Sequence, residues 1–203
     1  MTGKKLFVLA PAVACAVVLC GVAPAGAQSR SAVAPVSSAP EGSFGALGPL
    51  TDLVIARLEI GDLVAAAKFG TGKPIDDPVR EQQIRDQVRA QAIVLGIDPD
   101  ATVRFFDDQI DASTVVQRGL FAFWTAHPGQ APTSRPDLGQ LRQQLDQLTT
   151  ELLGQLVATV KIRQHTPACL AQSVIARVSG EITHHLDTLH RRALGDALRS
   201  VCD

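Results

Sequence analysis

The stretch LTDLVIARLEIGDLVAAAKF, residues 50–69, decides the fold class of this 203-residue chain. Its large apolar residues have the spacing of one helical face: Leu50, Leu53, Val54, Leu58, Leu63 and Val64. This pattern predicts one helix from near Leu47 to Phe69. The sequence GTGKP at 70–74 follows directly, and its Gly and Pro residues are typical of a helix end.

Two cations, Arg57 and Lys68, interrupt the apolar pattern of this helix. They are eleven residues apart, about three turns, so they share a face with Cα atoms roughly 16 Å apart along the axis. Arg80 and Arg142 lie in similar settings further along the chain, and we expect few acids near the four. Because charges rarely occupy core positions unless they are paired or bind something, the set predicts an anionic ligand. The alternative for each cation is a solvated or snorkelling side chain.

The rest of the chain also has helical patterns, separated by capping residues, Gly and Pro. Three further helices are expected from Asp76 or Asp77 to about Leu95, from Asp98 to about His127, and from Asp137 to about Gln164. Residues 168–201 predict one or two helices, with a break around Ser179 and Gly180. No segment alternates with a period of two. The sequence therefore predicts an all-α fold: a single helical domain of about five to six helices over residues 44–203.

The N-terminus has the features of an export signal. Lys4 and Lys5 precede an apolar run at 6–22, and an Ala-Gly-Ala site ends at Ala27. We expect a secretory signal peptide at 1–27 and a flexible, Ser-, Ala- and Pro-rich N-terminal tail at 28–43. A retained membrane anchor is the alternative, but the apolar run is short for a membrane span. The predicted location is secreted or periplasmic, with no membrane association after cleavage.

Charge and cysteine content limit the partners and the redox state. Removing residues 1–27 takes away two lysines and no acid, so 19 cations against 20 anions become 17 against 20, a net charge of −3. This balance gives no indication of a nucleic acid partner. Cys169 and Cys202 are the two cysteines that remain. In an exported chain they predict a disulfide closing a loop of about 33 residues, worth roughly 3–4 kcal/mol.

Motifs for several other chemistries are missing from the sequence. His184, His185 and His190 do not have the spacing of metal ligands, and adjacent helical residues point about 100° apart. We expect these histidines to be exposed helix residues and predict no metal. There is no nucleophile elbow, phosphate loop or dinucleotide fingerprint.

The region from about residue 45 to 203 resembles the all-helical chorismate mutases of the AroQ type. The positions that match this family's active site in type and spacing are Arg57, Lys68, Asp77, Arg80, Glu81, Ser113 and Gln117, with Arg142 on a later helix. The export signal and the cysteine pair are similar to those of the secreted gamma subclass. The resemblance implies the Claisen rearrangement of chorismate to prephenate, a complete site in each chain, no cofactor, and a homodimer.

The resemblance also implies a role for each matched residue. Arg57 and Arg142 would clamp the substrate carboxylates, and Lys68 and Gln117 would donate to the ether oxygen. Glu81, with the backbone of Asp77, would bind the substrate hydroxyl. Ser113 and Arg80 would support a carboxylate and the charge network.

The chain departs from the secreted subclass at two of these positions. Secreted members often have glutamate where this chain has Gln117, and threonine where it has Ser113. The rival hypothesis is an exported, non-enzymatic helical module that binds an aromatic dicarboxylate or a partner helix. Such a module needs Arg57 and Arg142, but it has no evident use for Lys68 together with Gln117.

Overall fold

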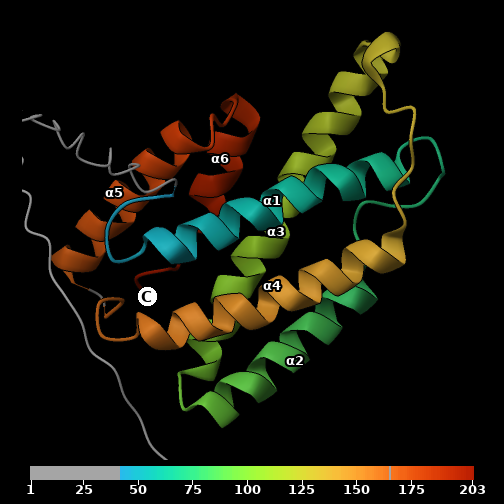
Figure 1. The fold of residues 1–203 in the computed structure, drawn as a ribbon. Coiled ribbons are helices and arrows are strands. Elements are labelled where there is room, and N and C mark those ends of the chain that lie inside the picture. Colours follow the sequence, from blue (N-terminus) through green and yellow to red (C-terminus); the bar gives the residue numbers. More distant parts are fainter. Residues whose placement is uncertain (1–41, 165) are drawn as a thin grey trace, which may run out of the picture. The chain divides into compact units, whose positions relative to one another are not determined.

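The computed structural model describes residues 42–164 and 166–203, so the expected signal peptide and most of the expected tail lie outside the described residues. The described chain contains α-helices, a short 3-10 helix and no strand, which confirms the predicted all-α fold (Figure 1). The elements in order are α1 (Gly48–Lys68), α2 (Pro78–Leu95), α3 (Pro99–Ala126), η1 (Pro128–Gln130), α4 (Leu138–Ala158), α5 (Pro167–Thr183) and α6 (Thr188–Ala197).

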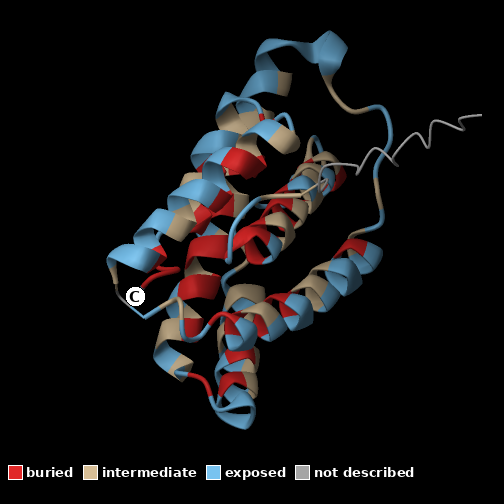
Figure 2. Cartoon of the chain, turned by 60° about the vertical axis from the view of Figure 1, so that its left-hand side comes forward, coloured by how far each residue is buried: buried red, intermediate tan, exposed pale blue. Residues whose placement is uncertain are grey.

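Helix α1 lies at the centre of the helical unit and packs against α3, α4, α5 and α6. Helix α3 crosses α1 and α2, while α4 and α2 lie side by side in Figure 1. The buried faces of these helices meet in one core, which includes Leu50 and Val54 of α1 and Phe105 and Phe106 of α3 (Figure 2). Each large side chain buried in this way stabilises the fold by about 1.5–3 kcal/mol. The core therefore supplies the rigid frame on which α1 to α4 converge.

Side-chain caps begin five of the helices, and at Asp77, Asp98 and Asp137 they lie where the sequence predicts a start. The side chains of Asp77, Asp98, Asp137, Thr166 and Asp187 each accept a hydrogen bond from a backbone N–H in the first turn. A cap of this kind is typically worth about 1 kcal/mol. At the other end of α2, Gly96 adopts a left-handed conformation with φ 70°, which glycine tolerates without steric cost.

Two predicted helix boundaries are wrong. Helix α4 ends at Ala158 rather than near Gln164. The side chain of Thr159 accepts a bond from Arg163 Nε, and Arg163 also donates to the carbonyl of Leu156. These bonds stabilise a tight turn after the helix, and a helical pattern alone does not reveal them.

The break between the last two helices lies after Thr183, not around Ser179 and Gly180. Ser179 lies inside α5, and its hydroxyl donates to the carbonyl of Ile175 in the preceding turn. Gly180 packs closely here, since a Cβ there would lie 2.6 Å from Ser43 Oγ and 2.9 Å from Cδ1 of Ile55 on α1. The turn falls instead at His185, whose φ is 51°.

The predicted disulfide between Cys169 and Cys202 is confirmed, with a Cα–Cα distance of 5.8 Å. It joins the first turn of α5 to the segment after α6. Asp108 of α3 holds the same segment, because its Oδ2 accepts bonds from Ser200 N at 2.8 Å and Oγ at 2.6 Å. The C-terminal helices are thus fastened to the back of α3, on which two of the predicted site residues lie.

Candidate active site

Two adjoining hollows lie where α1, α2, α3 and α4 converge, each of about 100 Å³. They share the residues Arg57, Val64, Asp77, Arg80, Ile84 and Leu145. The eight site residues expected from the sequence all line one hollow or both, namely Arg57, Lys68, Asp77, Arg80, Glu81, Ser113, Gln117 and Arg142. The structure therefore brings together residues that are up to 85 positions apart, as 142 minus 57 gives.

Arg57 is the most deeply placed cation, on the face of α1 that meets α4. Its side chain donates from one terminal nitrogen to the carbonyl of Leu145 at 3.2 Å and to the hydroxyl of Thr149 at 3.3 Å. Burial lowers the pKa of Arg57 to about 10, although the charge of Asp146 opposes this shift. Its Nε has no hydrogen-bond partner among the described residues. A buried, unused N–H of a guanidinium is a strong donor for a carboxylate.

Two ion pairs connect the remaining arginines across the site. Arg80 of α2 bonds to Asp146 of α4, and Arg142 of α4 bonds to Asp77 at 3.2 Å. The expectation of few acids near the cations is therefore wrong. Asp146 follows Arg142 by four residues, so both lie on one face of α4, and this spacing was the signal for it in the sequence.

Lys68 ends α1 with its ammonium turned toward the connection between α1 and α2. Its Nζ donates to the carbonyl of Ile75 at 2.7 Å. Burial lowers the pKa of Lys68, and Arg142 adds to the lowering while Asp77 opposes it. The sequence did not indicate the role of the Ile75 carbonyl, because backbone contacts of this kind leave no pattern of residue types.

Asp77 and Glu81 form a reciprocal cap at the start of α2. Asp77 Oδ1 accepts from the backbone N–H of Arg80 at 3.1 Å, and Glu81 Oε1 accepts from the N–H of Asp77 at 3.2 Å. This arrangement fixes both carboxylates at the rim of the site. It also holds the first turn of α2, which carries Arg80.

Ser113 and Gln117 lie one turn apart on the face of α3 that meets α1. Gln117 Nε2 donates to Ser113 Oγ at 3.1 Å, and the Gln117 side chain is buried. Its Oε1 has no partner within the described chain. Gly61 of α1 faces this pair, and a Cβ there would lie 3.5 Å from Ser113 Oγ, an ordinary contact distance. The amide is thus held in the site with part of its hydrogen-bonding capacity unused.

Apolar side chains close the walls between the polar groups, and the sequence analysis did not assign them to the site. They are Val64, Ile75, Ile84, Ile110, Leu138 and Leu145. By excluding water they strengthen every charge interaction within the hollows. Thr149, which orients Arg57, also lay outside the prediction, although it follows Arg142 by seven residues on the same helical face.

Two of the three histidines, His184 and His190, are less exposed than expected, whereas His185 is exposed as expected. The His190 side chain is 12 % exposed, and its ring nitrogens contact Asp62 and Asp187 at 2.9 Å each. His184 Nε2 contacts Asp52 of α1 at 3.1 Å. Both histidines therefore connect α1 to the C-terminal helices. The described residues contain no group of three or more His, Cys, Asp or Glu side chains arranged to hold a metal ion.

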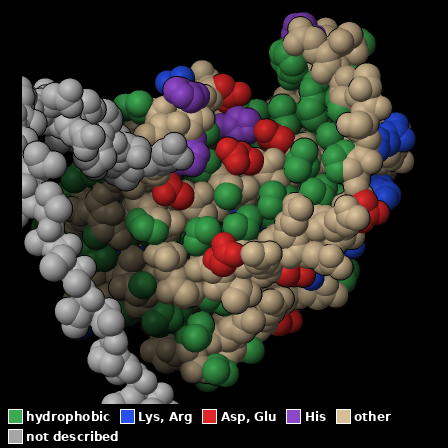
Figure 3. All heavy atoms as spheres, in the orientation of Figure 1, with side chains coloured by type: hydrophobic (Ala, Val, Ile, Leu, Met, Phe, Trp, Pro, Cys, Tyr) green, Lys and Arg blue, Asp and Glu red, His purple; other side chains and the backbone are tan. Residues whose placement is uncertain are grey.

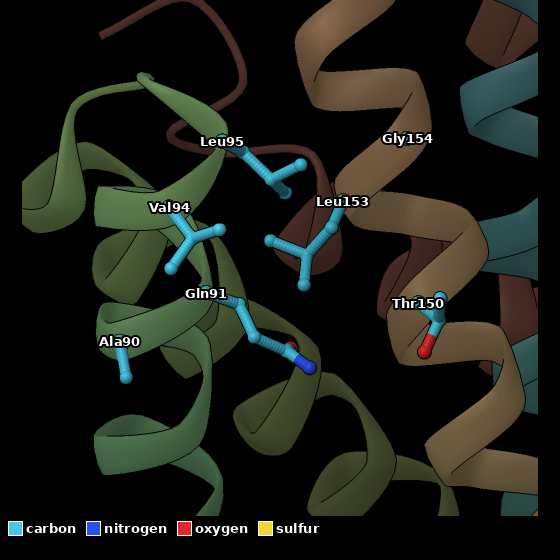
Figure 4. Close-up of a pocket in the computed structure, with 7 residues that line it drawn as sticks. All are labelled: Ala90, Gln91, Val94, Leu95, Thr150, Leu153 and Gly154. Carbon is cyan, nitrogen blue, oxygen red and sulfur yellow. The ribbon is translucent and has the colours of Figure 1, made fainter.

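A larger hollow lies between α2 and α4, but its lining differs in kind. It measures about 530 Å³ and is lined mainly by apolar groups such as Val94, Leu95 and Leu153 (Figure 4). It contains no charged residue. An anionic ligand is recognised by charged and hydrogen-bonding groups, so the smaller cationic hollows are the better candidate site.

Fold and site together define an all-helical protein with adjoining hollows, lined by four cations, where α1 to α4 converge. Residues 49–118 match the family described as Chorismate mutase type II. The chain is 36 % identical over 156 residues to the "Secreted chorismate mutase" of Mycolicibacterium smegmatis, covering 77 % of this chain and 86 % of that protein. It is 33 % identical over 202 residues to the protein of the same description from Mycobacterium tuberculosis, covering 100 % and 96 %.

Solved structures agree with this relationship. The crystal structure of chorismate mutase from Burkholderia thailandensis superposes with a TM-score of 0.73 at 36 % identity, covering 77 % of this chain and 99 % of that one. The chain belongs to the chorismate mutase type II family. Its relatives include proteins described as secreted, and it is a secreted or periplasmic protein. No helix in the described part of the chain is long and apolar enough to cross a membrane.

Proposed function

We propose that this chain catalyses the Claisen rearrangement of chorismate to prephenate in the cationic hollows between α1 and α4. The observation that carries the proposal is that Lys68 lines one of the two adjoining hollows, Gln117 lines the other, and Arg57 lines both, each side chain being buried or partly buried. The reaction is intramolecular: the ether C–O bond breaks while a C–C bond forms, without proton transfer. The protein therefore needs to restrain a flexible dianion and to stabilise negative charge on the ether oxygen.

The arginines are suited to the restraint. Arg57 offers its unpartnered Nε–H to one substrate carboxylate, and Arg142, about half exposed at the rim, binds the second. Arg142 is paired with Asp77 at 3.2 Å, so an incoming carboxylate competes with Asp77 for the guanidinium. Arg80 stays paired with Asp146 and contributes to the positive potential of the pocket, with Ser113 supporting the nearby carboxylate.

Lys68 and Gln117 act on the breaking bond. The Lys68 ammonium and the Gln117 amide donate hydrogen bonds to the ether oxygen, and both bonds strengthen as charge develops there. The substrate hydroxyl donates to the Glu81 carboxylate near the backbone of Asp77. All of these groups come from one chain, so a homodimer, which family resemblance suggests, is not required to complete the site.

The test is the loss of chorismate absorbance, with formation of prephenate, on adding purified protein lacking residues 1–27. An Arg57→Ala/Lys68→Ala double variant is the control. The non-enzymatic alternative gives the opposite result: calorimetry would detect binding of chorismate by the wild type, but the compound would be recovered unchanged. Size-exclusion chromatography with light scattering decides the oligomeric state. The intact mass of exported protein tests cleavage after Ala27.

A further inference from the structure

The connection between α1 and α2, residues 69–77, brings two groups to the site. Its Ile75 carbonyl accepts the bond from Lys68 Nζ at 2.7 Å, and Asp77 caps α2. Gly70 and Gly72 in the same segment have φ values of 69° and 75°. Because glycine adopts many backbone conformations, such a segment needs contacts from elsewhere to hold one of them.

One such contact comes from the helix that carries Gln117. The next residue, Arg118, donates from a single guanidinium nitrogen to both carboxylate oxygens of Asp76, at 2.9 and 3.0 Å. Asp76 lies between Ile75 and Asp77. This ion pair therefore connects α3 directly to the part of the connection that contacts Lys68.

The solvent exposure of the Arg118–Asp76 ion pair indicates how much the pair contributes to stability. The side chains are 61 % and 55 % exposed, and ion pairs of this kind contribute about 0–1 kcal/mol to stability. A substantial role in folding is therefore not expected. The pair can still affect the rate through the position of a catalytic group, since a misplacement of about 1 Å reduces rates by up to about 10²-fold.

We propose that Arg118 is a positioning residue: through Asp76 it holds the Ile75 carbonyl against Lys68, and so keeps the ammonium in place on the wall of the site. The inference rests on the proposed function. Arg118 itself lines neither hollow, so it acts through the connection rather than on the substrate. Asp76 also has a direct electrostatic effect on Lys68, so variants of Arg118 give the cleaner test.

The experiment compares Arg118→Gln and Arg118→Lys with a matched control, Arg89→Gln. Arg89 pairs with Asp100 at 2.6 Å, with side-chain exposures of 48 % and 70 %, and it connects α2 to α3 away from the hollows. We expect Arg118→Gln to lower kcat by about threefold to tenfold with KM changed less than about twofold, because the carboxylate clamps remain. Arg118→Lys keeps a cation and should retain most of the activity, and Arg89→Gln should match the wild type.

Hydrogen exchange provides a readout that does not depend on turnover. The peptide covering residues 69–77 should exchange its amide hydrogens faster in Arg118→Gln than in the wild type. In Arg89→Gln its exchange rate should equal that of the wild type. The inference is overturned if Arg118→Gln keeps wild-type kcat, if Arg89→Gln loses as much, or if Arg118→Lys is as slow as Arg118→Gln. A wild-type protein without mutase activity would instead overturn the proposed function, and the exchange data would still decide whether Arg118 holds the connection.

Discussion

At the scale of single residues, Lys68 combines features that suit an electrostatic catalyst. Its ammonium is held by the Ile75 carbonyl, and burial lowers its pKa. A cation in a partly dry site interacts more strongly with developing negative charge than one in water, and little reorganisation is needed during the reaction. The same surroundings make Lys68 easier to deprotonate than an exposed lysine, which limits the pH range in which it is charged.

Replacing Lys68 by alanine should chiefly lower kcat, by about 10²–10³-fold, because its bond to the ether oxygen strengthens in the transition state. KM should change less, since Arg57 and Arg142 still bind the carboxylates. Steady-state kinetics on chorismate measure both values. Lys161→Ala, an exposed lysine outside the hollows, is the control and should behave as wild type. Wild-type kcat in Lys68→Ala would remove Lys68 from the mechanism.

Gln117 sets the expected dependence of the rate on pH. An amide donates at any ordinary pH, whereas a glutamate donates only when protonated. The wild-type kcat/KM should therefore stay nearly constant from weakly acidic to mildly basic pH. It should then fall as Lys68 loses its proton, at a lower pH than for an ordinary lysine because its pKa is lowered.

Gln117→Glu should keep activity at low pH and lose it as the pH rises through the carboxyl pKa. A pH–rate profile of both proteins is the measurement. If the two profiles coincide, or if the wild type falls steeply around a raised carboxyl pKa of about 6, Gln117 is not the donor to the ether oxygen.

At the scale of helices, the first residues of the helices could be predicted from the sequence more accurately than their last residues. Asp77, Asp98 and Asp137 are capping residues whose chemistry is local, so the first residues of α2, α3 and α4 could be inferred directly. The ends of α4 and α5 depend on contacts made after the chain folds. A glycine in a helical pattern indicates a possible break, but Gly180 lies inside α5 and packs against Ser43 and Ile55, contacts that exist only in the folded chain.

The candidate site was predictable to a similar degree. Residues whose type and spacing carry the chemistry, such as Arg57 and Lys68, could be found in the sequence. The Ile75 carbonyl and the apolar walls could not, because they depend on how α1 to α4 converge. Asp146 and Thr149 lie between these cases, since they share a helical face with Arg142 but are ordinary helix residues when considered alone.

The His190 contacts between α1 and α6 should make stability depend on pH. Hydrogen bonds with Asp62, and then with Asp187, raise the pKa of His190 from 6.5 to about 9, despite partial burial. Because the folded pKa is raised, the contribution to stability is full below the unfolded pKa of 6.5 and is lost as the pH rises through about 9. The expected contribution is about 1–2 kcal/mol, since solvent screening at the exposed Asp187 reduces the effect.

His190→Gln should therefore lower the free energy of unfolding by about 1–2 kcal/mol near pH 6, and by much less near pH 10. Denaturant unfolding at both pH values gives the difference. His127→Gln is the control, because His127 is exposed, bonds to a backbone carbonyl and stacks on Phe123. A destabilisation by His190→Gln that is equal at both pH values would mean that packing, not charge, is responsible.

At the scale of the whole molecule, the candidate site and the contacts that hold the C-terminal helices in place lie in different parts of the fold. The hollows are built from α1 to α4, whereas the disulfide and the Asp108–Ser200 contacts lie around α5, α6 and the chain end. On the face shown in Figure 3, most visible Lys and Arg side chains lie toward the end where the α1–α2 and η1–α4 connections meet. Acidic side chains are visible among them on this face, so the cations at that end are partly paired with acids, as in the pairs Arg118–Asp76 and Arg142–Asp77.

This separation predicts different effects of reduction on stability and on rate. Breaking the Cys169–Cys202 bond frees a loop with a sequence separation of 33 residues. It should lower the free energy of unfolding by roughly 3–4 kcal/mol in the chain-entropy model. Turnover at 25 °C should change less than about twofold, because neither sulfur lines the hollows and the core still holds α1 to α4.

The measurement compares unfolding and kcat of oxidised protein, reduced protein and a Cys169→Ser/Cys202→Ser variant, with thiol titration confirming each state. A loss of kcat as large as that of Lys68→Ala, in protein that remains folded, would show that the C-terminal helices control the site through α3.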